Sequence, residues 1–201
     1  MELAFDVGDP GAPAALETAL MQRGYFIDVL INCAGLGLAG PFTAHSQQDL
    51  LRLIETNITG LTRLMRHVLP AMVARRHGGV LNVASLGGYM PGPYQAAYYA
   101  SKAYVLALSE AVDHELAGTG VRVVVLAPGP VDSRFHARMG AQTALYRLVV
   151  PSMSPTRVAS AGYWGFRLGR RVIVPGVLWP LSVLATRLLP HMLLIPVMGL
   201  L

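Results

Sequence analysis

The sequence predicts a single α/β domain with a parallel sheet covered by helices on both faces, and three observations support this prediction. Apolar, strand-like runs alternate with helical patterns along the chain, and such alternation is typical of parallel strands joined by crossover helices. The strand runs are continuous and rich in Val, Ile and Leu, as expected for strands that are buried on both faces. Finally, 201 residues, of which 53% are hydrophobic, suit one domain, residues 1–201, with a sizeable core.

Each predicted element follows from a local pattern. Short apolar runs predict strands at Glu2–Phe5, Ile27–Ile31, Gly79–Ala84, Val121–Leu126 and Val172–Val174. Helical patterns predict helices at Ala12–Arg23, Ser46–Arg76, Ala96–Leu116 and Pro155–Arg167. Ser46 and Asp49 have the spacing of a capping box at the start of the long helix, and Pro70 is expected to bend or break it.

The tail of the chain, residues 172–201, is a very apolar C-terminal extension. Arg187 splits its two uncharged stretches, and neither reaches the roughly 18 residues that a membrane-spanning helix needs. We expect this extension to form a helix-and-loop cap over the site at the sheet, or a subunit contact. Contact with a membrane surface is the less favoured alternative.

Composition argues against several classes of function. The net charge of +5 comes from arginines that are scattered singly or in pairs, so we expect no nucleic-acid partner. The six histidines have no ligand spacing and no acidic or cysteine companions, which argues against a metal site. Cys33 is the single cysteine, so no disulfide framework can form. The start of the sequence does not resemble a signal peptide, and we expect a cytoplasmic protein.

One glycine motif suggests a phosphate site, but its context is wrong. Gly35-Leu-Gly37-Leu-Ala-Gly40 matches the dinucleotide fingerprint G-x-G-x-x-G and follows a predicted strand. In that fingerprint the helix opens inside the glycines, so that its first amides meet the pyrophosphate. Here the residues 41–43 intervene and the predicted helix begins at Ser46. We therefore reject the motif as a pyrophosphate-binding turn.

The residues with chemical potential are concentrated between Ser85 and Lys102. Ser85 follows the apolar run 79–84, so it lies at the carboxyl end of a predicted strand. Tyr98 and Lys102, the only lysine in the chain, are four residues apart where a helix begins, which puts both on one helical face. An ammonium about 4 Å from a tyrosine hydroxyl is worth roughly 4 kcal/mol, and so lowers its pKa by about three units at most. This brings the tyrosine into the useful range for proton transfer.

These residues also allow two other interpretations. Tyr-x-x-x-Lys alone is a common surface pair on helices, so its meaning depends on the surrounding motifs. Ser85 could be a hydrolase nucleophile, but Val83-Ala84-Ser85-Leu86-Gly87 lacks the first glycine of the nucleophile elbow. A serine hydrolase is therefore disfavoured.

Further motifs surround the serine, the tyrosine and the lysine in a fixed order. Asn32-Cys33-Ala34-Gly35 follows a predicted strand, Asn57 lies within a predicted helix, and Pro128-Gly129-Pro130-Val131-Asp132-Ser133 follows a later strand. This ordered set resembles the short-chain dehydrogenase/reductase family over nearly the whole chain. The resemblance implies an NAD(P)-dependent oxidoreductase that interconverts a carbonyl and an alcohol by hydride transfer.

The resemblance also implies a role for each matching residue. The catalytic residues would be Asn57, Ser85, Tyr98 and Lys102. Tyr98 would act as general acid/base, Ser85 would orient the carbonyl, and Lys102 would hold the nicotinamide ribose. Asn57 would hold a water that links the lysine to solvent. The residues that would bind NAD or NADP are Asp6, Val7, Asn32, Ala34, Gly35, Tyr98, Lys102, Pro128, Gly129, Val131 and Ser133.

The partners implied by the resemblance are a small molecule and a second copy of the chain. The substrate would be a carbonyl compound or an alcohol, and the apolar C-terminal extension suggests that this substrate is apolar. Helices 46–76 and 96–116 would pack in a homo-oligomer, as the matching helices do in the family. The choice between NAD and NADP stays open at this point.

The sequence departs from the family at its beginning. The family starts with a strand, a Thr-Gly-rich loop and a helix, followed by a second strand and helix, roughly 60 residues in all. We expect these first two strand–helix units to be absent, which leaves a doubly wound, Rossmann-like parallel sheet that is incomplete at the N-terminus. Ile27–Ile31 would then be a bare apolar edge. A catalytically silent fragment, or an interaction or dimerisation domain, is therefore the alternative to an enzyme.

We predict that the 201-residue chain binds NADH and NADPH weakly or not at all. No glycine-rich turn in the sequence leads directly into a helix N-terminus, where backbone amides and the helix dipole would hold the pyrophosphate. Isothermal titration calorimetry on the purified chain measures this affinity directly. Micromolar affinity for either cofactor, from soluble and folded protein, would contradict the prediction.

Overall fold

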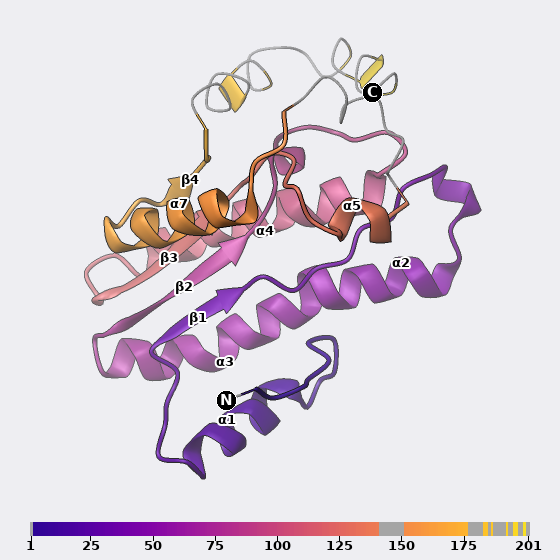
Figure 1. The fold of residues 1–201 in the computed structure, drawn as a ribbon. Helices are drawn as coiled ribbons and strands as arrows, with labels where there is room; N and C mark the ends of the chain where they lie inside the picture. The colour runs from indigo at the N-terminus through magenta and orange to yellow at the C-terminus, as the bar shows by residue number, and fades with distance from the viewer. Residues whose placement is uncertain are drawn as a thin grey trace.

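The computed structural model describes residues 2–140 and 151–176, together with positions 183, 184, 186, 192, 195, 196 and 199. Its sheet has parallel strands in the order β1-β2-β3-β4 (Figure 1). The strands are β1 (Val29–Asn32), β2 (Gly78–Val83), β3 (Val121–Leu126) and β4 (Val172–Ile173). The predicted α/β fold with a parallel sheet is confirmed, and these strands lie close to their predicted bounds.

Helices cover both faces of this sheet. The α-helices are α1 (Ala12–Met21), α2 (Gln47–Ile54), α3 (Leu61–Ala74), α4 (Ala96–Glu115), α5 (Phe135–Arg138) and α7 (Pro155–Arg167). Shorter or irregular turns are η1 (Phe42–Ala44), the π-helix η2 (Glu55–Gly60) and η3 (Leu86–Tyr89). Figure 1 shows α7 on one side of the sheet and α3 with α4 on the other.

The core consists of two layers, one on each face of the sheet. Val123 and Val125 of β3 pack with Met65 of α3 and Val105 of α4. Val124 of the same strand joins the second layer under α7. Neighbouring residues of β3 are thus buried on opposite faces, which explains why this strand appears in the sequence as a continuous apolar run.

The predicted helix Ser46–Arg76 is interrupted, but not where proline suggested. Ser46 caps α2 as expected, because its Oγ accepts a hydrogen bond from the Asp49 amide at 3.0 Å. The irregularity is the π-helix η2, which separates α2 from α3. Pro70 lies inside α3, which continues to Ala74. The prediction that Pro70 breaks the helix is wrong. Pro70 is exposed, so water can solvate the backbone carbonyl that loses its partner.

The predicted strand Glu2–Phe5 is wrong. Residues 2–6 have no strand hydrogen bonds, and no strand of the described chain lies beside them. An isolated extended segment cannot pair its backbone groups, and so a strand pattern without a neighbour does not form a strand. In the described part of the chain β1 is the edge of the sheet, as predicted, and Ile31 is 59% exposed there.

The N-terminal turn packs instead on the π-helix. The Asp6 carboxylate accepts a hydrogen bond from the Gly8 amide at 2.9 Å, and Arg63 of α3 donates to the Gly8 carbonyl at 3.0 Å. The Val7 carbonyl lies where a side chain on Gly60 would begin. Gly60 therefore allows the turn to approach the end of η2.

Beyond position 176, most residues of the apolar extension 172–201 are outside the described part of the chain. Its expected role as a cap therefore stays a prediction. Its beginning forms β4, which pairs with β3 through Val172 and Ile173. No helix in the described part of the chain is long and apolar enough to cross a membrane.

We predict that Gly60→Ala destabilises the protein. The new β-carbon would overlap the Val7 carbonyl, which is backbone and cannot move aside like a flexible side chain. Overpacking of this kind typically lowers the free energy of unfolding by about 1–3 kcal/mol, and urea denaturation measures the change.

Gly11→Ala is the matched control for this substitution. Gly11 precedes α1 with φ −81°, and the nearest atom to its added β-carbon would be an Asp9 carboxylate oxygen at 3.4 Å. We expect little change there. Equal losses of stability in both variants would show that residues 6–9 do not pack on η2 as described.

Candidate active site

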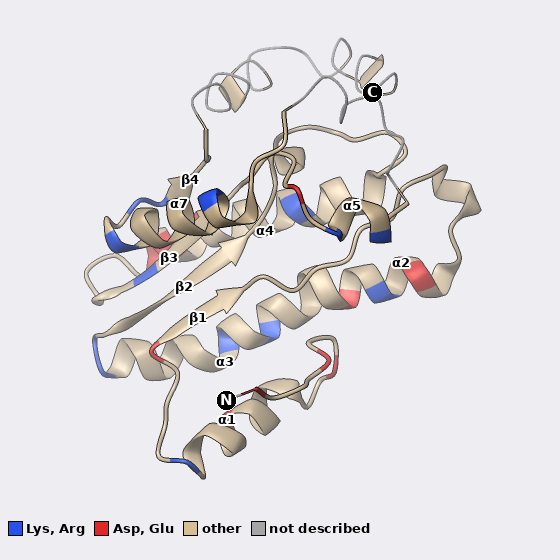
Figure 2. Ribbon diagram, viewed as in Figure 1, with Lys and Arg blue, Asp and Glu red and all other residues tan. Residues whose placement is uncertain are grey.

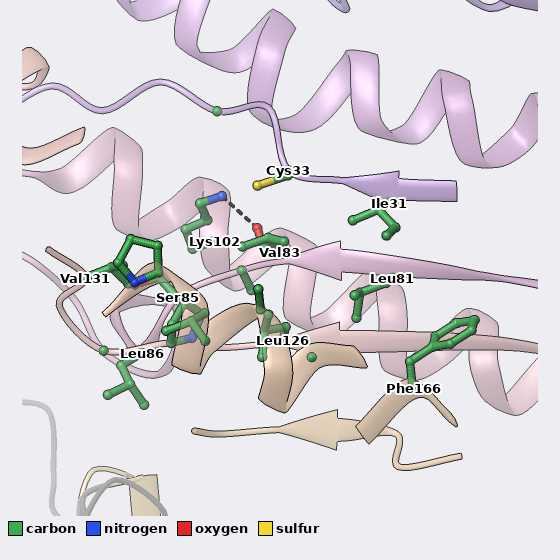
Figure 3. A pocket seen from close by; sticks show the side chains of 18 of the residues that line it. Ile31, Cys33, Leu81, Val83, Ser85, Leu86, Lys102, Leu126, Val131 and Phe166 are labelled. Carbon is green, nitrogen blue, oxygen red and sulfur yellow. Dashed lines mark hydrogen bonds between the residues drawn. The ribbon is translucent and has the colours of Figure 1, made fainter. Parts of the chain in front are cut away.

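The carboxyl ends of β1, β2 and β3 open into one cavity of about 1390 Å³ (Figure 3). Eight of the residues predicted from the sequence line it, namely Gly35, Ser85, Tyr98, Lys102, Pro128, Gly129, Val131 and Ser133. The cavity continues over the open face of the sheet, where Ile31, Leu81 and Phe166 form an apolar end. The site therefore has a polar end, where Ser85, Tyr98 and Lys102 lie at the strand termini, and a largely apolar end beneath α7, whose lining also includes Asp28, Arg122 and Arg167.

Five predicted residues are not in the lining. Asn32 and Asn57 are buried beside the cavity, and Ala34 lies in the loop between β1 and η1. Asp6 and Val7 belong to the N-terminal turn on η2. The structure therefore does not bring Asp6 and Val7, two of the predicted cofactor-binding residues, to the cavity wall.

Tyr98 and Lys102 are one turn apart on α4, and the lysine is directed into the sheet. The Lys102 ammonium lies 5.8 Å from the centre of the Tyr98 ring and donates a hydrogen bond to the Val83 carbonyl at 2.9 Å. That carbonyl belongs to the last residue of β2. Lys102 is only 6% exposed, so a cation is held in the interior at the end of the strand.

Burial controls the charge of this lysine. Removal from water lowers the pKa of the Lys102 ammonium from 10.5 to about 8, and electrostatic attraction to the neighbouring Cys33 partly opposes the shift. Figure 3 shows Cys33 at the end of β1, on the wall of the same cavity as Lys102. The lysine is therefore mostly charged at pH 7 but close enough to its pKa to exchange a proton.

Ser85 stands at the start of η3. Its Oγ accepts a hydrogen bond from the Gly87 amide at 3.1 Å and thereby caps this short helix. A hydroxyl that accepts in this way still has its own hydrogen to donate. Ser85 also lines the cavity, so that hydrogen can be directed to a carbonyl oxygen bound there.

Asn57 connects three parts of the site from within the π-helix. Its carboxamide accepts from the Leu36 amide and donates to the Leu36 carbonyl, both at 2.8 Å. It also donates to the Ser101 hydroxyl at 3.0 Å. The side chain thus fixes the loop after β1 against α4. Whether it also holds a water for Lys102 stays a prediction.

Gly35 lies between these groups. A β-carbon on it would be 3.5 Å from both the Asn57 carboxamide oxygen and the Lys102 ammonium nitrogen. Glycine therefore leaves the loop backbone open beside the lysine, and a bound molecule can approach both.

A buried polar connection lies under the site. Asn32, the last residue of β1, donates to the Asn82 carboxamide oxygen at 2.8 Å, and Asn82 donates to Ser109 of α4 at 2.9 Å. All three side chains are buried. These hydrogen bonds join β1 to β2 and β2 to α4, whereas the predicted contact of Asn32 with a cofactor stays a prediction.

The loop after β3 supplies the other wall. The Pro128 carbonyl accepts from the Leu86 amide at 2.9 Å, which ties this loop to η3. The Ser133 hydroxyl accepts from the Phe135 amide at 3.3 Å at the start of α5. The loop therefore brings Pro128, Gly129 and Val131 to the wall of the cavity that Lys102 also lines.

Sequence reasoning missed two residues next to the tyrosine. The Phe135 ring packs on the Tyr98 ring with 5.4 Å between centres, and it reaches over Gly37. Ser101, fully buried, donates to the Tyr98 carbonyl at 2.7 Å and accepts from Asn57. A buried serine three residues after the tyrosine was visible as a polar residue on the inner helical face. Nothing in the sequence signalled Phe135.

This arrangement agrees with the comparisons to known proteins. The family model described as short chain dehydrogenase matches residues 1–144. The chain therefore belongs to the short-chain dehydrogenase family.

Individual relatives point the same way. The chain is 35% identical to a probable NADP-dependent dehydrogenase of Haemophilus influenzae, over 82% of this chain and 68% of the relative. It is 38% identical to the NADP-dependent 3-hydroxy acid dehydrogenase of Escherichia coli, over 79% of this chain and 66% of the relative. A short-chain dehydrogenase from Sphingobium yanoikuyae, solved in complex with NADPH, superposes with a TM-score of 0.77 at 29% identity. That superposition covers 90% of this chain and 70% of the other.

The chain is shorter than these relatives. It spans about two thirds of the two named above and between 39% and 60% of several others, among them reductases of Bos taurus and Chromohalobacter salexigens. The activity, the substrate and the partners of the whole protein are therefore proposals.

We predict that Lys102 makes the stability of the protein rise with pH above 8. Between pH 8 and 10.5 the unfolded chain keeps the lysine proton, whereas the folded chain loses it because burial disfavours the charge. Stability lost to the buried charge below pH 8 is therefore regained as the pH rises, by up to about 3 kcal/mol.

Lys102→Met is the reference for this measurement. It removes the only lysine in the chain, so subtracting its free energy of unfolding at each pH isolates the lysine term. Urea denaturation of both proteins from pH 7 to 10.5 gives the difference. A difference that does not change over this range would show that Lys102 is not buried as a cation.

Proposed function

We propose that this protein is an NAD(P)-dependent oxidoreductase that interconverts a carbonyl compound and an alcohol, with Tyr98 as general acid/base. The observation that carries the proposal is the meeting of Ser85, Tyr98 and Lys102 at one cavity, at the carboxyl ends of parallel strands. Two groups that bear hydroxyls and one buried cation are what a carbonyl oxygen needs when it becomes negative. Membership of the short-chain dehydrogenase family supports the same reaction.

The residues present fit a nicotinamide cofactor at the polar end of the cavity. Gly35 leaves backbone accessible beside Lys102, and both lie on the cavity wall. We assign Lys102 and Tyr98 to the nicotinamide ribose, and Ala34 with Gly35 to the adenosine ribose. Pro128, Gly129, Val131 and Ser133 would flank the nicotinamide from the opposite loop. When bound, the cofactor supplies or accepts the hydride.

The protein's own residues then manage one proton. In the reducing direction, Tyr98 gives its hydroxyl proton to the carbonyl oxygen as the carbonyl carbon gains a hydride, and the product is the neutral alcohol. Ser85 donates a hydrogen bond to the same oxygen and so orients it. The Lys102 ammonium, held on the Val83 carbonyl, stabilises the tyrosinate that remains. In the oxidising direction the proton moves back from the alcohol to the tyrosinate.

We propose an apolar substrate. The described lining residues from the segments around Tyr98 are mostly apolar, namely Leu86, Met90, Tyr99, Phe135 and Met139, with Gln95 and His136 as polar members. The two arginines among the described lining residues, Arg122 and Arg167, lie at the other end, where β3 begins and α7 ends. A substrate carboxylate or sulfonate at Ser85 would therefore find few cations. This distinguishes the proposed substrate from the 3-hydroxy acids of the Escherichia coli relative.

Assembly and location are part of the same proposal. We propose a homo-oligomer through the helices of 46–76 and 96–116, and a cytoplasmic location. Both stay predictions, which the mass of the protein in solution and cell fractionation can test.

We predict that, in a form of the protein extended by the family's first two strand–helix units, Tyr98→Phe abolishes turnover while cofactor affinity stays nearly unchanged. The substitution removes the acidic hydroxyl but keeps the ring that packs on Phe135. The assay is kcat for reduction of apolar ketones with NADPH or NADH titrated to saturation, and calorimetry follows cofactor binding. We expect kcat to fall by about 10²-fold or more.

Tyr104→Phe is the control, because it deletes a hydroxyl from the same helix outside the cavity. Tyr104 is 37% exposed, and its hydroxyl lies 3.0 Å from that of Thr62. It should keep wild-type kcat. More than a few per cent of wild-type turnover in Tyr98→Phe would exclude Tyr98 as the acid. A wild-type protein that is folded, binds cofactor and shows no turnover would favour the catalytically silent alternative.

A further inference from the structure

Charge is divided unequally along the chain. Residues 133–201 contain eight arginines and neither aspartate nor glutamate, so this part carries a net charge of +8. Residues 1–132 contain eight Lys and Arg but eleven Asp and Glu, a net charge of −3. The total of +5 therefore conceals a strongly basic C-terminal third. Asymmetry of this kind indicates an interaction with a nucleic acid or a membrane.

The described part of this basic region presents a mixed apolar and basic surface at the end of α7 and in the turn that follows it. Trp164 is 58% exposed and Leu168, one turn further on, is 68% exposed. Tyr163 is exposed beside Trp164, with 5.2 Å between the ring centres. Arg167, the last residue of α7, and Arg170, three residues later, are exposed beside them. Figure 2 shows basic residues on α7, in blue, and no acidic ones, which would be red. We call Tyr163, Trp164, Arg167, Leu168 and Arg170 the α7 surface.

This surface is not needed by the fold. The inner side of α7 packs on the sheet through Val158, Gly162 and Gly165. A β-carbon on Gly165 would overlap the Ile173 side chain, which shows how closely that side approaches β4. Trp164 and Leu168 therefore expose apolar area that folding leaves free. Neighbouring apolar residues that are surrounded by one sign of charge mark an interaction site.

We propose that the α7 surface binds the surface of a lipid bilayer that contains anionic phospholipids. Trp and Tyr prefer the interface between headgroups and acyl chains, Leu enters the acyl boundary, and arginines are attracted by the lipid phosphates. The sequence continues in the same sense, because residues 177–201 are apolar with one arginine and no acidic residue.

The chemistry of the surface favours lipid over the two other partners. A second copy bound symmetrically through this surface would bring Arg167 and Arg170 against the same arginines, and like charges repel. A nucleic acid would satisfy the arginines and stack on the aromatic rings, but it offers little to Leu168. An anionic bilayer satisfies the charged and the apolar side chains together.

The test measures how much of the full chain floats with lipid vesicles. One set of vesicles contains phosphatidylcholine alone, and the other contains phosphatidylcholine with about 30% phosphatidylserine. We expect binding to the anionic vesicles only, weakened by salt. Arg167→Gln with Arg170→Gln should lower the partition coefficient by more than tenfold, since each arginine is worth about fivefold. Trp164→Ser with Leu168→Ser should also reduce it by at least tenfold. Thermal denaturation confirms that each variant is folded.

Two controls and one spectroscopic readout sharpen the test. Arg52→Gln with Arg66→Gln removes the same charge from exposed positions on α2 and α3, and should leave binding within about twofold. Leu51→Ser removes a similarly exposed leucine from α2 and is the matched control for the substitution of Leu168. In a Trp179→Phe background Trp164 is the only tryptophan, and its fluorescence should shift to the blue on anionic vesicles.

Four outcomes would overturn the proposal. The first is no flotation with anionic vesicles, or equal flotation with neutral ones. The second is an equal effect of the two arginine pairs. The third is vesicle binding that a DNA oligonucleotide abolishes and that the double variant Trp164→Ser with Leu168→Ser retains. This result would assign the basic region to nucleic acid. A dimer that dissociates in that apolar variant and does not float would assign the surface to a second copy.

Discussion

The site depends on holding one ammonium group inside the protein. Lys102 is buried, and the charge that it carries at neutral pH is costly unless a partner accepts its hydrogen bonds. The Val83 carbonyl is such a partner, because β2 ends there and leaves the group available. The bond fixes α4 relative to the end of the strand. Tyr98, one turn earlier on the same helix, is thereby placed at the mouth of the cavity.

Close packing around this bond explains why residue 88 is glycine. Gly88 in η3 lies so near α4 that a β-carbon would be 2.8 Å from the Lys102 carbonyl carbon. Gly35 leaves space on the other side of the ammonium. Two sets of buried polar side chains, Asn32–Asn82–Ser109 and Asn57–Ser101, then join the strands and the loop to α4. Hydrogen bonds are directional, so these buried polar side chains fix the relative positions of the strands, the loop and α4 more strictly than an apolar core of equal size would.

Local sequence predicted most of this fold, and tertiary context decided the rest. The bounds of Val121–Leu126 and Pro155–Arg167 agree with β3 and α7, because continuous apolar runs and capped amphipathic patterns are local signals. The segment Glu2–Phe5 has the composition of a strand, but a strand also requires a neighbour, which its own residues cannot specify. The π-helix η2 has ordinary helical residues, so periodicity alone does not reveal it. Ser85, Tyr98 and Lys102 could be found by spacing, whereas Phe135 reaches Tyr98 only through the path of the loop after β3.

The two sides of α7 connect the cavity with the basic surface. Val158, Gly162 and Phe166 line the apolar end of the cavity, while Trp164 and Leu168 project away from the sheet. A helix that rests on a bilayer by its outer side holds the apolar end of the cavity within one helix diameter, about 10 Å, of the lipid. Apolar carbonyl compounds concentrate in that phase, since burial of their surface is favourable there. The proposed apolar substrate and the proposed contact of the α7 surface with lipid would therefore answer one requirement, namely access for a substrate that water dissolves poorly.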